Sequence, residues 1–197
     1  MQKKLKDIFL ACGGQMRMSE AVKRGISRYM LYALRDKGAI EQISRGVYRL
    51  SELSAVSNPD LVTIGVRFPN AVICLISALA YHEITTQIPH SVSVAVSRKS
   101  RRPFLDYPPL SVHRFSGLSF HAGIEEHQID GTTIKIYSSE KTLADCFKFR
   151  NKLGMDVVLE ALKLYKARKQ FNIEALIRYA KICRVENVMR PYLEASI

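Results

Sequence analysis

The chain has 197 residues, 47% hydrophobic and 24% charged, a composition that excludes an intrinsically disordered protein. No stretch is long and apolar enough to cross a membrane, and residues 1–7 lack the apolar run of a signal peptide, so we expect a cytoplasmic protein with no membrane contact. The net charge of +12 lies in residues 1–57 (11 basic, 5 acidic) and 141–197 (12 basic, 6 acidic), which favours a polyanionic partner such as DNA, RNA or anionic lipid.

The first forty residues carry the pattern of three short helices. Apolar residues recur at helical spacing in residues 5–12, and two glycines then end the helix. A second short helix fits residues 19–24. Ser27 is a good N-cap for a third helix over residues 28–37, and Gly38 is suited to end it.

The third helix has one face of a kind that could contact DNA bases. Arg28, Tyr32 and Arg35 stand at positions i, i+4 and i+7, so they share the face opposite to the apolar one. Tyr29 lies beside them. We therefore predict these four residues as base contacts, because arginine can bond guanine bidentately in the major groove.

Residues 39–43 and 47–50 are predicted to form two short strands around the turn at residues 44–46. Three helices followed by a hairpin with a basic tip is the order of a winged helix-turn-helix, which we assign to residues 1–52. The residues expected to contact the DNA backbone are Lys23, Arg24, Ser27, Arg45 and Arg49.

A serine-rich connector at residues 51–57 separates this domain from a predicted second domain, residues 58–197. The expected elements are a helix capped by Asn58 and ending near residue 68, an apolar helix over 71–82, and strands over 91–96, 110–115, 126–129 and 132–137, the last two joined by a hairpin turn at Asp130-Gly131. The helices expected after these strands include one capped by Ser138 and one capped by Asn172. The predicted fold class is therefore α+β, with a small, largely antiparallel sheet and C-terminal helices in the second domain.

Four cations lie in five residues between two of the predicted strands: Arg98, Lys99, Arg101 and Arg102. Such a run is either a solvated loop or a second patch that contacts phosphates beyond the winged helix. The sequence alone leaves both interpretations open.

No motif for catalysis or metal binding is present. The four cysteines lie far apart, and the five histidines between residues 82 and 127 match no ligand spacing. Nucleophile elbows, phosphate-binding glycine loops and metalloprotease motifs are missing from the sequence. We therefore predict no catalytic residue, no metal and no cofactor.

Several segments, in the same order along the chain, resemble the AbiEi-like antitoxins, the regulators of type IV abortive-infection toxin–antitoxin systems. These segments are residues 73–82, 86–89, 101–103, 107–110, 114–117, 140–147 and 150–154. Together with the winged helix, the resemblance covers nearly the whole chain.

The resemblance implies a transcriptional autorepressor that binds inverted repeats upstream of its own operon and opposes a nucleotidyltransferase-type toxin, with or without direct contact. The alternative is a protein-binding module whose C-terminal domain captures a toxin or another partner, with DNA binding secondary. RNA binding is less favoured, because the aromatic residues are not clustered on a predicted sheet face.

Overall fold

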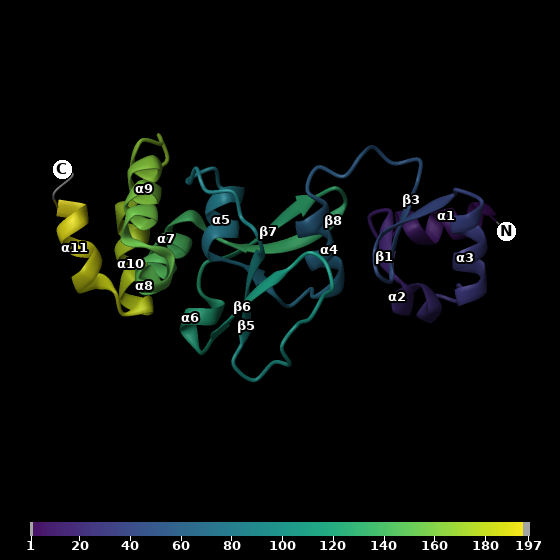
Figure 1. Ribbon diagram of the computed structural model, residues 1–197, viewed down its shortest axis with the longest axis horizontal. Coiled ribbons are helices and arrows are strands. Elements are labelled where there is room, and N and C mark those ends of the chain that lie inside the picture. The colour runs from purple at the N-terminus through teal and green to yellow at the C-terminus, as the bar shows by residue number, and fades with distance from the viewer. Residues whose placement is uncertain (1, 195–197) are drawn as a thin grey trace. The chain divides into compact units, whose positions relative to one another are not determined.

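The computed structural model describes residues 2–194 and contains two compact units (Figure 1). The N-terminal unit comprises Met1–Ala71 together with Glu126–Ile134, and the C-terminal unit comprises Val72–Glu125 and Lys135–Ile197. The domain division at residues 52–58 stays a prediction, because packing in the folded chain does not tell which segments fold alone.

The N-terminal unit contains helices and a small antiparallel sheet in the strand order β1-β3-β2. Its elements are α1 (Gln2–Leu10), β1 (Gln15–Arg17), α2 (Met18–Lys23), α3 (Arg28–Asp36), β2 (Ile40–Ser44), β3 (Val47–Leu50) and α4 (Pro59–Arg67). The three helices and the hairpin agree with the sequence prediction. Strand β1 was not predicted, since three residues are too few to show an alternating pattern.

Helix α3 is fixed at both ends and along one face. The Ser27 Oγ accepts a hydrogen bond from the Met30 amide at 3.2 Å, as predicted for an N-cap, and Gly38 takes the positive φ of 70° that ends the helix. Leu31 and Leu34 are buried in the core of this unit. The opposite face of α3 therefore points outward.

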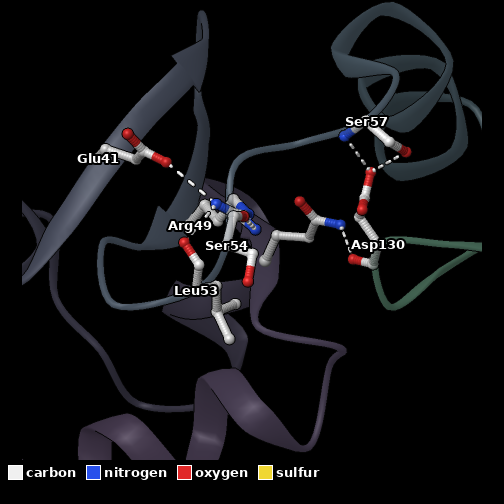
Figure 2. A network of polar contacts seen from close by, with 7 residues as sticks. Glu41, Arg49, Leu53, Ser54, Ser57 and Asp130 are labelled. Carbon is white, nitrogen blue, oxygen red and sulfur yellow. Dashed lines mark hydrogen bonds and ion pairs between the residues drawn. The ribbon is translucent and has the colours of Figure 1, made fainter.

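The sheet of the N-terminal unit packs against α1 and α3, and further elements cover the rest of it. Helix α4 contacts all three strands, and the turn between β7 (Ile124–Ile129) and β8 (Thr132–Tyr137) packs beside β1. The Gln15 amide nitrogen donates to the Asp130 carbonyl at 2.7 Å and to the Thr132 hydroxyl at 2.5 Å. Figure 2 shows the Asp130 carboxylate accepting from the amide and hydroxyl of Ser57, at 2.8 and 2.9 Å.

The same turn meets the chain after α1 without any intervening side chain. A Cβ atom on Gly131 would lie 2.4 Å from the Gly13 carbonyl oxygen, so the two glycines pack backbone against backbone. Asp130 and Gly131 both have positive φ, 47° and 76°, as a type I′ hairpin turn requires. The hairpin predicted at this position is therefore confirmed.

The remaining elements form a five-stranded sheet and a group of helices. They are β4 (Val72–Ile73), α5 (Leu75–Tyr81), β5 (Val92–Ser97), β6 (Leu110–Phe115), α6 (Leu118–His121), α7 (Ser139–Lys148), α8 (Arg150–Leu153), α9 (Met155–Lys166), α10 (Ile173–Cys183) and α11 (Glu186–Glu194). The strand order is β6-β5-β4-β8-β7. Predicted N-caps at Asn58, Ser138 and Asn172 are each confirmed by a hydrogen bond to the first turn.

Two predictions for this region need correction. The sheet is mixed and not largely antiparallel, because β4 pairs with β8 and β5 with β6 in parallel. The helix predicted over residues 71–82 begins only at Leu75, since Val72 and Ile73 form strand β4 between β5 and β8. A short apolar run cannot be assigned to helix or buried strand from its periodicity alone.

The core of the C-terminal unit contains an ion pair within α7. Lys141 and Asp145 are both 0% exposed, and their Nζ and Oδ2 atoms lie 2.5 Å apart. The Lys141 ammonium also lies over the ring of Tyr137, and the second Asp145 oxygen accepts from the Cys183 thiol at 3.2 Å.

No helix within residues 2–194 has the length and hydropathy to cross a membrane.

Candidate nucleic-acid interface

An open hollow of about 770 Å³ lies in the N-terminal unit, beside the outward face of α3. Arg28, Tyr32 and Arg35, which the spacing on α3 placed on one face, all line it. The turn between β2 and β3 contributes Arg45. The arginines around the hollow come from four different parts of the unit: Arg17, Arg28, Arg35, Arg45 and Arg67.

Positive charge dominates the hollow, because none of the residues described as lining it is acidic. Arg17 donates to the carbonyl oxygen of Arg67 at 3.3 Å, and Arg67 donates to that of Arg45 at 3.2 Å. Neutral carbonyls orient these guanidinium groups without cancelling their charge. A cluster of this kind attracts a ligand with several negative charges.

Arg35 has a carboxylate neighbour just outside the hollow. Its guanidinium donates to Asp36 at 2.8 and 3.0 Å, and this hydrogen bond and charge raise the pKa of Arg35 above its usual value. The guanidinium carbon also lies 5.3 Å from the centre of the Tyr32 ring. The Asp36 pair is exposed, so little free energy opposes its exchange for a phosphate or a base.

Tyr48 and Gln42 line the hollow from the two strands of the hairpin, together with the apolar residues Met18 and Val22. Burial raises the pKa of Tyr48, which keeps its phenol protonated and neutral. The hollow therefore combines a rim of arginines with neutral polar and apolar groups. Surfaces that bind nucleic acids use both kinds of group, for phosphates and for bases.

The other residues predicted to contact DNA lie outside this lining. Tyr29 is 81% exposed on α3, and Lys23 is exposed at the end of α2. Arg24 forms an exposed pair with Glu20 at 2.9 Å. The Ser27 hydroxyl caps α3, so its first role is structural.

Arg49 was predicted to contact the DNA backbone, and the structure does not allow this role. Its side chain is 4% exposed, and its guanidinium donates to Glu41 at 3.3 Å and to the carbonyl oxygens of Leu53 and Ser54 (Figure 2). Arg49 pairs with Gln15 across β3 and β1, on the sheet face that α4 and the β7–β8 turn cover. We therefore remove Arg49 from the predicted contacts.

Two of the arginines that line the hollow were missed by the sequence analysis: Arg17 and Arg67. Arg17 lies on the unpredicted strand β1, and Arg67 lies beyond the predicted domain boundary. The sequence offered one signal for Arg67, a basic residue in the last turn of a helix. Basic residues are also common at that position because they interact favourably with the helix dipole, so the signal does not indicate a binding site by itself.

The second predicted patch lies in the C-terminal unit. Arg98, Lys99, Arg101 and Arg102 are all exposed in the segment between β5 and β6.

Within the part of the chain that the structure describes, no three His, Cys, Asp or Glu side chains are grouped to hold a metal ion.

Comparison with known proteins identifies the class of the N-terminal segment. Residues 4–51 match the model of a family described as "Transcriptional regulator, AbiEi antitoxin". The chain thus carries an AbiEi regulator domain at its N-terminus. This agrees with the family inferred from the sequence for the N-terminal segment, while the resembling segments between residues 73 and 154 lie outside the matched residues.

Among solved structures, the chain is similar to the Rv2827c protein from Mycobacterium tuberculosis, with a TM-score of 0.60 and 14% sequence identity. The alignment covers 91% of this chain and 70% of that one. At this identity the likeness concerns the fold alone. No curated protein sequence matches the chain.

Proposed function

We propose that this protein is a sequence-specific transcriptional repressor, with a winged helix-turn-helix that binds duplex DNA through the hollow beside α3. The observation that carries the proposal is the set of five arginines around that hollow with no acidic residue in its lining. The order helix, strand, two helices and hairpin supports the winged-helix assignment, as does the regulator family matched over these residues.

In this proposal α3 enters the major groove. Arg28 and Arg35 bond guanine edges, and Tyr32 lies between them with its ring against Arg35. Arg45, in the turn of the hairpin, contacts a phosphate or the minor groove. Arg17 and Arg67, from β1 and α4, bind backbone phosphates. Lys23, Arg24 and the exposed Tyr29 extend the same contact along the DNA.

We further propose that the DNA is an inverted repeat upstream of the protein's own operon, and that the protein acts as the antitoxin to a nucleotidyltransferase-type toxin. The description of the matched family, a regulator and an antitoxin at once, supports the antitoxin role. The antitoxin role is separable from DNA binding. An adjacent toxin gene whose product is harmless only when this chain is present would support it.

Fluorescence anisotropy tests the DNA-binding proposal. The protein is titrated with its own upstream duplex and with a scrambled duplex of equal length, over a series of salt concentrations. Specific repression predicts at least about tenfold tighter binding to the upstream duplex, or about 1.4 kcal/mol. A steep salt dependence with equal affinity for both duplexes would contradict sequence-specific recognition.

A matched pair of variants locates the contact. Arg67→Gln removes a cation from the hollow, and Lys37→Gln removes an exposed cation just after α3 that does not line it. We expect Arg67→Gln to lower the slope of log affinity against log salt by about 0.9, the value for one phosphate contact. Lys37→Gln should change it less.

A further inference from the structure

The segment from Arg98 to Pro109 connects two parallel strands and crosses the length of the sheet edge. The amide of Arg98 donates to the Phe115 carbonyl at the end of β6, and the carbonyl of Pro109 accepts from Val92 at the start of β5. Parallel neighbours require such a crossover. Here it contains no helix and forms a wide loop outside the sheet (Figure 1).

This crossover segment is held in place although most of its side chains are exposed. Pro103 and Pro108 are buried, and they fix the backbone at two points. Arg114, on the neighbouring strand β6, donates to the carbonyl oxygens of Arg98 at 2.7 Å and Ser100 at 3.3 Å. The segment is therefore an anchored platform, not a solvated tail.

Two aromatic side chains of the crossover segment are exposed to water. Phe104 is 76% exposed and Tyr107 is 69% exposed. Both belong to the same anchored segment, and large exposed apolar groups are candidates for a binding surface. Arg101 and Arg102 precede Phe104 with only Pro103 between them, and the twelve residues of the segment contain one acidic residue, Asp106.

We propose that the crossover segment binds single-stranded nucleic acid, with its cations on the phosphates and with Phe104 and Tyr107 stacked on unpaired bases. Proteins that bind single strands combine a basic track with aromatic platforms in this way. Bases inside a duplex are stacked on each other and cannot offer a face to either ring. The proposal is independent of duplex binding at the hollow in the N-terminal unit.

The test uses labelled oligothymidylate and oligouridylate of about 20 nucleotides, longer than the usual site of one small domain. Anisotropy with the full chain gives both affinities, which also tell whether DNA or RNA is preferred. The double variant Phe104→Ala/Tyr107→Ala should lose at least about tenfold in affinity for the preferred strand. The double variant Phe104→Tyr/Tyr107→Phe keeps both rings and should bind like the original protein.

A second pair of variants tests the cations. Arg101→Gln/Arg102→Gln should lower the salt slope for the single strand by about 1.4, or about 0.7 for each phosphate that is no longer neutralised. Lys163→Gln/Lys169→Gln removes two exposed cations at α9 and just after it, and should change the slope less. Thermal unfolding of each variant confirms that exposed substitutions leave the fold intact.

Two results would overturn the proposal. One is binding of both oligonucleotides that is unchanged in the Phe104→Ala/Tyr107→Ala variant. The other is a loss that occurs with the upstream duplex and not with the single strands, which would make the crossover segment a duplex contact. The variant Arg28→Ala separates the two sites, because it should weaken the duplex and leave the single strand unaffected.

Discussion

Two groups of charged residues, one in each unit of this protein, use positive charge in opposite ways. In the N-terminal unit, five arginines surround an open hollow with no acidic residue in its lining. In the C-terminal unit, Lys141 is completely buried, and its charge is balanced by Asp145 at 2.5 Å and by the rings of Tyr137 and Phe115. The first arrangement leaves charge available to a ligand, and the second uses charge within the fold.

The difference shows which cations can serve function. An exposed guanidinium is hydrated and loses little by leaving its partner, so it can exchange water for a phosphate. A buried ammonium has lost its hydration and depends on its counterion. Lys141 therefore belongs to the core although it lies in one of the segments that resemble the antitoxin family.

The strongest test of this contrast is Asp145→Ala. The substitution leaves Lys141 buried without a counterion and removes the acceptor of the Cys183 thiol. We expect the free energy of unfolding to fall by about 3–5 kcal/mol, measured by urea denaturation.

Glu186→Ala is the control for that experiment. It breaks an exposed pair with Arg190 at 2.8 Å, which lies at the same i, i+4 spacing. The expected loss is at most about 1 kcal/mol. Equal losses for the two variants would show that burial does not distinguish the pairs.

The second test concerns the contact between Gly131 and Gly13 in the N-terminal unit, where backbone packs against backbone and leaves no open space as the hollow does. Gly131→Ala places a methyl group 2.4 Å from the Gly13 carbonyl oxygen at a φ of 76°. We expect a loss of about 2 kcal/mol or more in the free energy of unfolding, from left-handed strain together with overlap.

Gly25→Ala separates these two causes, because Gly25 has a φ of 87° and no atom within 4 Å of its added Cβ. It should lose only the strain, about 1–2 kcal/mol. If Gly131→Ala costs no more than Gly25→Ala, the backbone contact between the two glycines does not constrain the fold.

The third test returns to the hollow. Arg28→Ala should weaken binding to the upstream duplex by about 1–3 kcal/mol and relax the preference over scrambled DNA, since the variant cannot bond a base edge at this position. Its fold should be unchanged, because the side chain is exposed and forms no ion pair among the residues described. An unaltered ratio of the two affinities would rule out base recognition by Arg28.

The local elements were largely predictable from the sequence. Caps at Ser27, Asn58 and Ser138 and the turn at residues 130–131 are determined by neighbours in sequence, and each was found where it was expected. The face of α3 followed from helical spacing in the same way. What depended on distant packing was missed, including strands β1 and β4 and the parallel pairing of β5 with β6.

The candidate site shows the same limit. Arg28, Tyr32 and Arg35 could be grouped because one helix positions all three. Arg17 and Arg67 reach the hollow only through the packing of α4 against the sheet, which no local pattern encodes. Arg49 failed as a prediction for the same reason, since the elements that cover it lie outside the first 52 residues.

The smallest expected effect concerns the protonation of a partly buried histidine, which would place a positive charge away from water. His113 on β6 is partly buried, with its ring against Phe149, and burial together with the charge of Lys152 lowers its pKa. The unfolded chain then takes up this proton at a higher pH than the folded one, so stability falls as the pH drops below about 6.5. Urea denaturation at neutral and mildly acidic pH should show a smaller pH dependence for His113→Gln than for the original protein. An identical dependence in both would mean that His113 is as easily protonated in the folded protein as in the unfolded chain.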